Sequence, residues 1–166
     1  KKSFALAAVL ATLPMFAQAQ DVIRHKLPDS DFPIARAVEV PAGKTTVYVS
    51  GAVPAVADAA ADPKTPEAWG DTKTQTVSVL TGIEATLKDL GLTMGDVVKM
   101  QVFLVAPKDA PADFAGFMEG YTQFFGTAEQ PNLPARSAMI VNQLVNPNWL
   151  VESIALLPVN GIFAYA

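Results

Sequence analysis

Two charged residues near the end of the chain border apolar segments. Arg136 stands in the segment 133–141, LPARSAMIV, and Glu152 stands in the segment 149–155, WLVESIA. The apolar patterns predict two strands that pair as a hairpin, which would set the arginine and the glutamate at matching edges. Burying either charge without a partner is costly or forces a pKa change. The pair is therefore either a structural cross-strand ion pair or part of a site.

Other catalytic constellations are absent from the sequence. There is no cysteine, which excludes a thiol nucleophile, a disulfide framework and a thiolate metal site. The single histidine, His25, lies between Arg24 and Lys26, where a solvated surface residue is expected. No Gly-rich phosphate loop and no cluster of metal-ligating residues occurs, so we predict no cofactor and no metal.

The first nineteen residues are typical of a secretory signal peptide. Lys1 and Lys2 precede an apolar run that is too short to cross a bilayer, and Ala17-Gln18-Ala19 has the small-x-small pattern of a cleavage site. A membrane anchor is the alternative interpretation. We expect cleavage after Ala19 and a periplasmic or secreted protein that has no membrane contact once the signal is removed.

The charge balance disfavours nucleic-acid binding. Removing Lys1 and Lys2 reduces the 12 basic residues to 10, against 16 acidic ones, so the net charge changes from −4 to −6. Binding a phosphate backbone requires a basic face, and no cluster of lysine and arginine supplies one. We therefore expect no nucleic-acid partner.

The remaining chain reads as one domain, residues 20–158, followed by a tail, residues 159–166. Period-two apolar patterns predict strands, and apolar residues spaced by three and four predict helices. The first two strands are expected to form a hairpin, residues 21–32 a loose lead, and residues 52–70 a surface loop. The expected elements are strands 37–40 and 45–50, a helix from 71 or 72 to 90, a strand 97–105, a helix from 111 to 125, and strands 137–144 and 150–157. This β-β-α-β-α-β-β order predicts a two-layer α+β fold.

Several short motifs, in this order, resemble the RidA/YjgF family of reactive-intermediate deaminases, also called the endoribonuclease L-PSP family. They are Val49-Ser50-Gly51, the segment 90–99, the segment 120–125, Pro134-Ala135-Arg136-Ser137 and Val151-Glu152. The resemblance runs from Phe32 to Pro158. It implies a chorismate-mutase-like subunit and a homotrimer with sites between subunits. The family's ribonuclease designation has little support in this acidic chain.

The resemblance also implies an activity. Family members hydrolyse 2-imino acids such as 2-iminobutanoate and 2-iminopropanoate, or their enamine tautomers, to 2-keto acids and ammonia. By resemblance, Arg136 would hold the substrate carboxylate, since a guanidinium fork donates two parallel hydrogen bonds. Glu152 would position and activate water. Gly51 and Ala138 would line the pocket.

Three positions depart from the family pattern. Ile34 stands where a tyrosine is common, Met118 where an asparagine is common, and Ala138 where a cysteine is frequent. All three align with substrate-binding positions, so we expect a more apolar and roomier pocket that favours larger hydrophobic side chains or abolishes turnover. The alternative to an enzyme is a non-catalytic periplasmic trimer that binds a small carboxylate or acts as a chaperone.

Overall fold

The structure is a computed structural model that describes residues 21–159. The predicted signal peptide, residues 1–19, and all but Val159 of the predicted tail lie outside the described residues. Within the described range the chain forms six strands and two α-helices in the order β-β-β-α-β-α-β-β. They are β1 (Ile23–Lys26), β2 (Ala35–Glu39), β3 (Thr45–Ala52), α1 (Thr72–Asp89), β4 (Lys99–Val105), α2 (Phe114–Tyr121), β5 (Ala135–Val141) and β6 (Val151–Val159).

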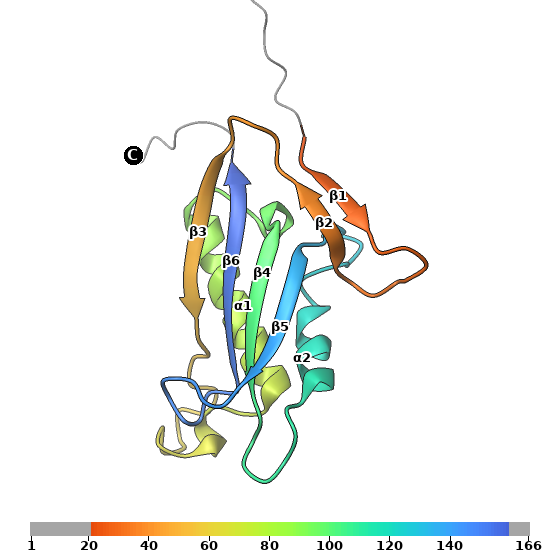
Figure 1. Ribbon diagram of the computed structural model, residues 1–166. Helices are drawn as coiled ribbons and strands as arrows, with labels where there is room; N and C mark the ends of the chain where they lie inside the picture. Colours follow the sequence, from red (N-terminus) through yellow and green to blue (C-terminus); the bar gives the residue numbers. More distant parts are fainter. Residues whose placement is uncertain (1–20, 160–166) are drawn as a thin grey trace, which may run out of the picture.

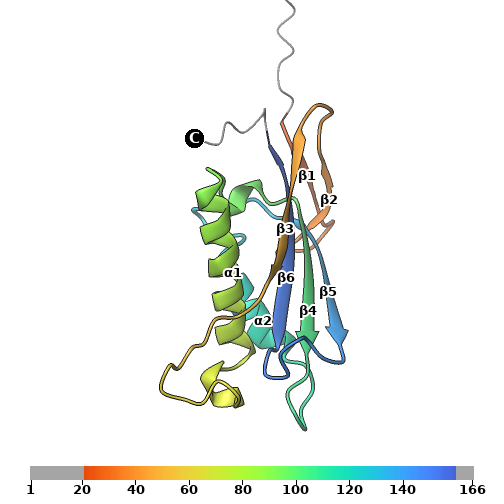
Figure 2. The ribbon, with the colours of Figure 1, turned by 90° about the vertical axis from the view of Figure 1, so that its left-hand side faces the viewer.

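Four strands form the main sheet in the order β3-β6-β4-β5, and β1 and β2 form a separate ribbon. Strand β6 is antiparallel to both of its neighbours, whereas β4 and β5 are parallel. Helices α1 and α2 lie on one face of the sheet, as the side view shows (Figures 1 and 2). The predicted two-layer α+β fold is confirmed, and the sheet has one face without helices, called here the outer face.

The predicted hairpin between the last two strands is wrong. Strand β5 pairs with β4, and β6 inserts between β3 and β4 (Figure 1). Nine residues, 142–150, separate β5 from β6, which is longer than the usual hairpin loop and long enough to pass over the end of β4. The amide of Val105 accordingly donates to the carbonyl of Leu150, at 2.9 Å. Because β6 is the most apolar strand, the centre of the sheet is where it buries most surface.

The predicted hairpin between the strands at 37–40 and 45–50 is also wrong. Strand β2 pairs instead with β1, which forms within the segment predicted as a loose lead, and β3 pairs with β6. Pro41 lacks an amide N–H for pairing, and Gly43, at a φ of +86°, turns the chain away from β2. The segment between β3 and α1 carries only the short 3₁₀ turn Pro66–Ala68, which agrees with the predicted loop.

Both predicted helices form, with ends set by capping. The side chain of Asp71 accepts the amide of Thr74 at the start of α1, and Gly91 follows the helix at a φ of +70°. Helix α2 is shorter than predicted and ends at Tyr121, after which the chain turns through Gly126. Among residues 21–159, neither helix has the length and apolar character that a membrane span requires.

The two helices pack closely at Gly120, which lies against Thr76 of α1. A Cβ atom added at Gly120 would lie 2.8 Å from the Cβ of Thr76 and 3.2 Å from the carbonyl oxygen of Lys73. Gly120→Ala is therefore expected to lower the free energy of unfolding by about 1–3 kcal/mol through overpacking. Urea denaturation measures this loss.

Gly82 provides the matched control for that substitution. It lies on the exposed side of α1, and a Cβ added there meets nothing within 4 Å. Gly82→Ala is expected to raise the free energy of unfolding by about 0.5–1 kcal/mol because alanine favours helix. Equal effects of the two substitutions would contradict the packing described at Gly120.

Candidate active site

The side chain of Arg136 points toward α2. Arg136 pairs with Met100 of β4, whose side chain is fully buried in the core beneath the helices. Paired residues on neighbouring strands project from the same face of a sheet, so Arg136 lies on the helix side. The Nη1 atom of Arg136 is 3.3 Å from the sulfur of Met118 on α2.

Four aromatic rings surround the guanidinium group of Arg136. Its Cζ atom lies 4.3 Å from the ring centre of Tyr121 and 4.9 Å from that of Phe117, both buried in the core. Phe32 and Phe114 lie at 5.5 and 5.9 Å. Cations are attracted to the faces of aromatic rings at these distances, which stabilises the charged group in a mostly apolar setting.

The charge of Arg136 has no anionic partner in the described part of the chain. Among residues 21–159, no carboxylate lies within salt-bridge distance of the guanidinium, whose polar side-chain neighbours are the thioether of Met118, a weak acceptor, and the hydroxyl of Tyr121. Burial lowers the pKa of Arg136, although a guanidinium remains charged at neutral pH. A partly buried cation without an anion is suited to binding a carboxylate ligand.

Tyr121 holds the segment before β2 beside this group. Its hydroxyl donates to the carbonyl of Pro33 at 3.0 Å, and burial raises the pKa of Tyr121 far above its ordinary value, so the hydroxyl stays protonated. The amide of Ala35 donates to the carbonyl of Pro134, just before β5, at 2.9 Å. These two bonds bring Phe32 to Arg136, although the two residues are far apart in the sequence.

Helix α2 is positioned by its own cap. The side chain of Asp113 accepts the amide of Gly116 at 2.8 Å and so begins the helix. The helix then presents Phe114, Phe117 and Tyr121 along one side at helical spacing, with neighbouring ring centres 5.7 Å apart. Phe117 and Tyr121 thus belong to the core and, together with the exposed Phe114, form part of the surroundings of Arg136.

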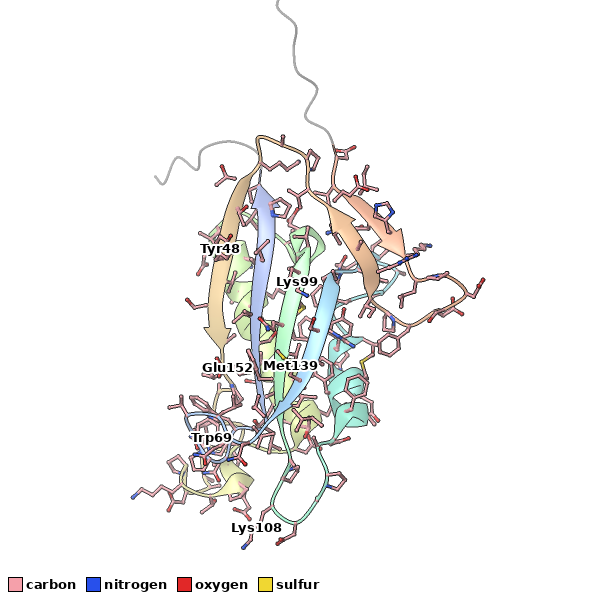
Figure 3. All side chains as sticks on the ribbon, viewed as in Figure 1. Tyr48, Trp69, Lys99, Lys108, Met139 and Glu152 are labelled. Carbon is pink, nitrogen blue, oxygen red and sulfur yellow. The ribbon has the colours of Figure 1, made fainter. Side chains whose placement is uncertain are left out.

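Glu152 lies on the outer face of the sheet. Glu152 pairs with Phe103 of β4, which alternates with the buried residues Val102 and Leu104 and so projects from the other face. Figure 3 shows Glu152 in front of the sheet, away from the helices. The carboxylate lies directly against the α-carbon of Gly51, in the space that any other residue's Cβ would fill. The structure therefore brings together the two predicted site residues Gly51 and Glu152.

Arg136 and Glu152 do not meet within one chain. They lie on opposite faces of the sheet, on strands that do not pair with each other. A site that contains both side chains requires two copies of the chain. The cross-strand ion pair considered from the sequence is absent from the described residues, because β6 is inserted elsewhere in the sheet.

The other predicted site residues lie in two places. Met118 contacts Arg136, and Ala138 follows Arg136 on the same face of β5, exposed to solvent. Ile34 instead lines a separate small cavity of about 140 Å³, together with Arg24 and Leu133. In a tight turn the amide of Ile34 donates to the carbonyl of Phe32 at 2.7 Å. This turn separates the side chain of Ile34 from that of Phe32.

Four aromatic neighbours of Arg136 were not predicted as site residues. For Phe114, Phe117 and Tyr121, the available signal was an aromatic stripe ending close to a glycine, which is typical of an ordinary core helix. Phe32 gave no signal because its proximity to Arg136 depends on the hydrogen bonds of Pro33 and Ala35.

Comparison with known proteins identifies the family of this chain. The family model described as Endoribonuclease L-PSP matches residues 32–157. A RutC family protein of Pyrococcus abyssi is 36% identical over 128 residues, which cover 76% of this chain and 87% of the relative. The chain therefore belongs to the endoribonuclease L-PSP family, which is the RidA/YjgF family.

Two further proteins give the same result. An Escherichia coli K12 protein named "Putative reactive intermediate deaminase TdcF" is 33% identical over 111 residues, 66% of this chain and 78% of that protein. The crystal structure of Escherichia coli TdcF with bound serine has a TM-score of 0.53 and 28% identity, covering 84% of this chain and 98% of that one. The Rid family protein YyfB of Yersinia pestis has a TM-score of 0.60 and 26% identity, with 82% and 98% covered.

The contact between Gly51 and Glu152 gives a testable effect. Gly51→Ala would displace the Glu152 carboxylate, which is the flexible end of a side chain, so the fold tolerates the change while the carboxylate moves. Under the function proposed below, in which Glu152 takes part in the reaction, kcat is expected to fall about tenfold to a hundredfold, because misplacing a reacting group by an ångström has effects of this size. The melting temperature should change little. Thr81→Ala, a change at an exposed position of α1 on the helix side of the sheet, should leave kcat unaltered.

Proposed function

We propose that this protein hydrolyses 2-imino acids and their enamine tautomers to 2-keto acids and ammonia. The observation that carries the proposal is the half-buried guanidinium of Arg136, which has no carboxylate partner among residues 21–159. The name of the relative TdcF and its structure with bound serine, which bears a carboxylate, support the same chemistry. A 2-imino acid carries a carboxylate next to its C=N group. A site that binds this carboxylate therefore also fixes the position of the reacting carbon.

The proposed reaction divides the chemistry between two side chains. The guanidinium of Arg136 binds the substrate carboxylate through two parallel hydrogen bonds and so fixes the adjacent imine carbon. A water molecule attacks the carbon of the imine, whose nitrogen is protonated. The Glu152 carboxylate accepts the proton that this water loses. Glu152 returns that proton to the nitrogen of the resulting carbinolamine. The C–N bond then breaks and ammonia leaves while the C=O bond forms, and Glu152 accepts the hydroxyl proton, which finally passes to the ammonia.

The proposed site lies at the boundary between subunits. Since Arg136 and Glu152 of one chain lie on opposite sheet faces, Arg136 would act with Glu152 of the partner subunit. The outer face also carries exposed Tyr48 and Met139, seen in Figure 3, and large apolar side chains left in water favour burial against another copy. We propose a homotrimer, as the family resemblance implies, with one site at each boundary.

A trapping assay tests the proposed activity. An amino-acid oxidase generates 2-imino acids in solution, and semicarbazide traps those that have not been hydrolysed. Purified protein is expected to reduce the rate of trapping, and Arg136→Ala is expected to abolish this reduction. Unchanged trapping with every imino acid, in protein shown by mass measurement to be a folded trimer, would refute the deaminase proposal.

One observation favours the non-catalytic alternative. The Arg136 guanidinium contacts the thioether of Met118, where the family commonly has an asparagine, so one polar group is missing beside the carboxylate clamp. A carboxylate binder needs Arg136 but not Glu152. Binding of a 2-keto acid that depends on Arg136, with no turnover of any imino acid, would support this alternative over the enzyme.

We also propose that the protein is exported. The basic start, the short apolar run and the small-x-small pattern at Ala17 to Ala19 support this proposal. Cell fractionation with N-terminal sequencing of the mature chain tests it. A mature protein that begins at Gln20 is expected, and cytoplasmic protein that retains Phe4 to Phe16 would refute export.

A further inference from the structure

Two of the four rings around Arg136 are open to solvent. Phe32 is 40% exposed and Phe114 is 43% exposed, whereas Phe117 and Tyr121 are buried. The exposed rings come from different parts of the chain, Phe32 from the segment before β2 and Phe114 from the first turn of α2. The guanidinium thus has a buried aromatic side that supports it and an exposed aromatic side that a ligand can reach.

The neighbouring part of β5 continues this apolar surface. Ala138 and Ile140 alternate with outer-face residues and so project from the same face as Arg136, and both are exposed. The thioether of Met118 adds another weakly polar group beside the guanidinium. The groups around the guanidinium of Arg136 are therefore mostly apolar. They would face the side chain of a ligand whose carboxylate binds Arg136.

We infer that Phe32 and Phe114 determine specificity and select substrates with a bulky apolar side chain. This inference rests on the proposed function, in which Arg136 holds the carboxylate of a 2-imino acid. With the carboxylate fixed there, the substrate side chain lies among exposed rings 5.5 and 5.9 Å from the guanidinium. An alanine-type side chain covers little of these rings, while a leucine-type side chain covers them and removes apolar surface from water.

Binding of stable reaction products tests the inference separately from turnover. Calorimetric titration compares 4-methyl-2-oxopentanoate, the leucine-type 2-keto acid, with pyruvate, the alanine-type one. The larger acid is expected to bind about 10- to 100-fold more tightly, the range that a few buried carbons give in an apolar pocket. Equal affinities, tighter binding of pyruvate, or no binding of either acid would overturn the inference.

Single substitutions identify the residues that carry the preference. Phe32→Ala and Phe114→Ala are each expected to weaken binding of the larger acid several-fold more than binding of pyruvate, because the methyl group of pyruvate covers little of either ring. Both residues are surface-exposed, so the fold should tolerate the changes. Ile23→Ala, which removes an exposed apolar side chain on β1, is the control and should alter neither affinity. An unchanged preference in both phenylalanine variants would overturn the assignment.

The two proposals fail in different ways. Selective, Phe32-dependent and Phe114-dependent binding without turnover of any imino acid would refute the deaminase and leave the inferred side-chain recognition intact. Arg136-dependent turnover with equal kcat/KM for alanine-derived and leucine-derived imino acids would support the deaminase and overturn the inferred specificity.

Discussion

Arg136→Ala is expected to lower kcat/KM for 2-imino acids by about 10²- to 10³-fold. Truncating one partner of a partly buried, charge-assisted carboxylate contact removes about 3–4 kcal/mol of binding, which converts to a rate effect of this size. The groups that remain around this position are aromatic rings, which do not replace a guanidinium as a carboxylate partner. Steady-state trapping assays measure the loss.

Arg136→Lys is the matched variant for that prediction. A lysine keeps the positive charge but not the planar fork that donates two parallel hydrogen bonds, so an intermediate loss is expected. Circular dichroism and thermal melting should show that both variants are folded. Full activity in the alanine variant would exclude Arg136 as the carboxylate clamp.

Glu152→Gln is expected to lower kcat by about 10²- to 10⁴-fold and to leave the affinity for 2-keto acids nearly unchanged. Glutamine keeps the shape of the side chain beside Gly51 but does not accept and return a proton, and general acid–base catalysis contributes factors of this size. Separate measurements of kcat and of product binding distinguish this effect from a binding defect.

Glu152→Asp is the control for the acid–base role. It keeps the carboxylate and shortens the side chain, so part of the activity should remain while the glutamine variant is inactive. A glutamine variant with normal kcat would show that water activation does not depend on Glu152 and would favour a binding protein or another base.

The helices and the limits of most strands follow from local sequence signals. Asp71 and Asp113 mark the starts of α1 and α2 as caps, and Gly91 marks a stop. A period-two pattern tells which side of a strand is buried, yet it does not tell which strands are neighbours. The two predicted hairpins failed for this reason, because loop 142–150 and Pro41 let the chain leave the adjacent strand.

In the candidate site, too, the residue types could be predicted from the sequence, but their arrangement in space could not. Arg136 was identifiable as a charge within an apolar strand, and the family motif gave Glu152 and Gly51 with it. The opposite directions of Arg136 and Glu152 depend on where β6 inserts in the sheet, which no local pattern encodes. The approach of Phe32 to Arg136 depends on hydrogen bonds to Tyr121 and Pro134, formed only when distant segments pack.

Mixing two inactive variants tests whether Arg136 of one copy acts with Glu152 of the partner subunit. Arg136→Ala and Glu152→Gln proteins are unfolded together in equal amounts, refolded and assayed for hydrolysis of a leucine-derived 2-imino acid. In a random mixture, about half of the copies keep Arg136 and the other half keep Glu152. About one quarter of the boundaries therefore combine both wild-type residues, and about one quarter of wild-type activity is expected to return. Mixed oligomers, verified by native mass spectrometry, that remain as inactive as either variant alone would show that the two residues do not share a site between subunits.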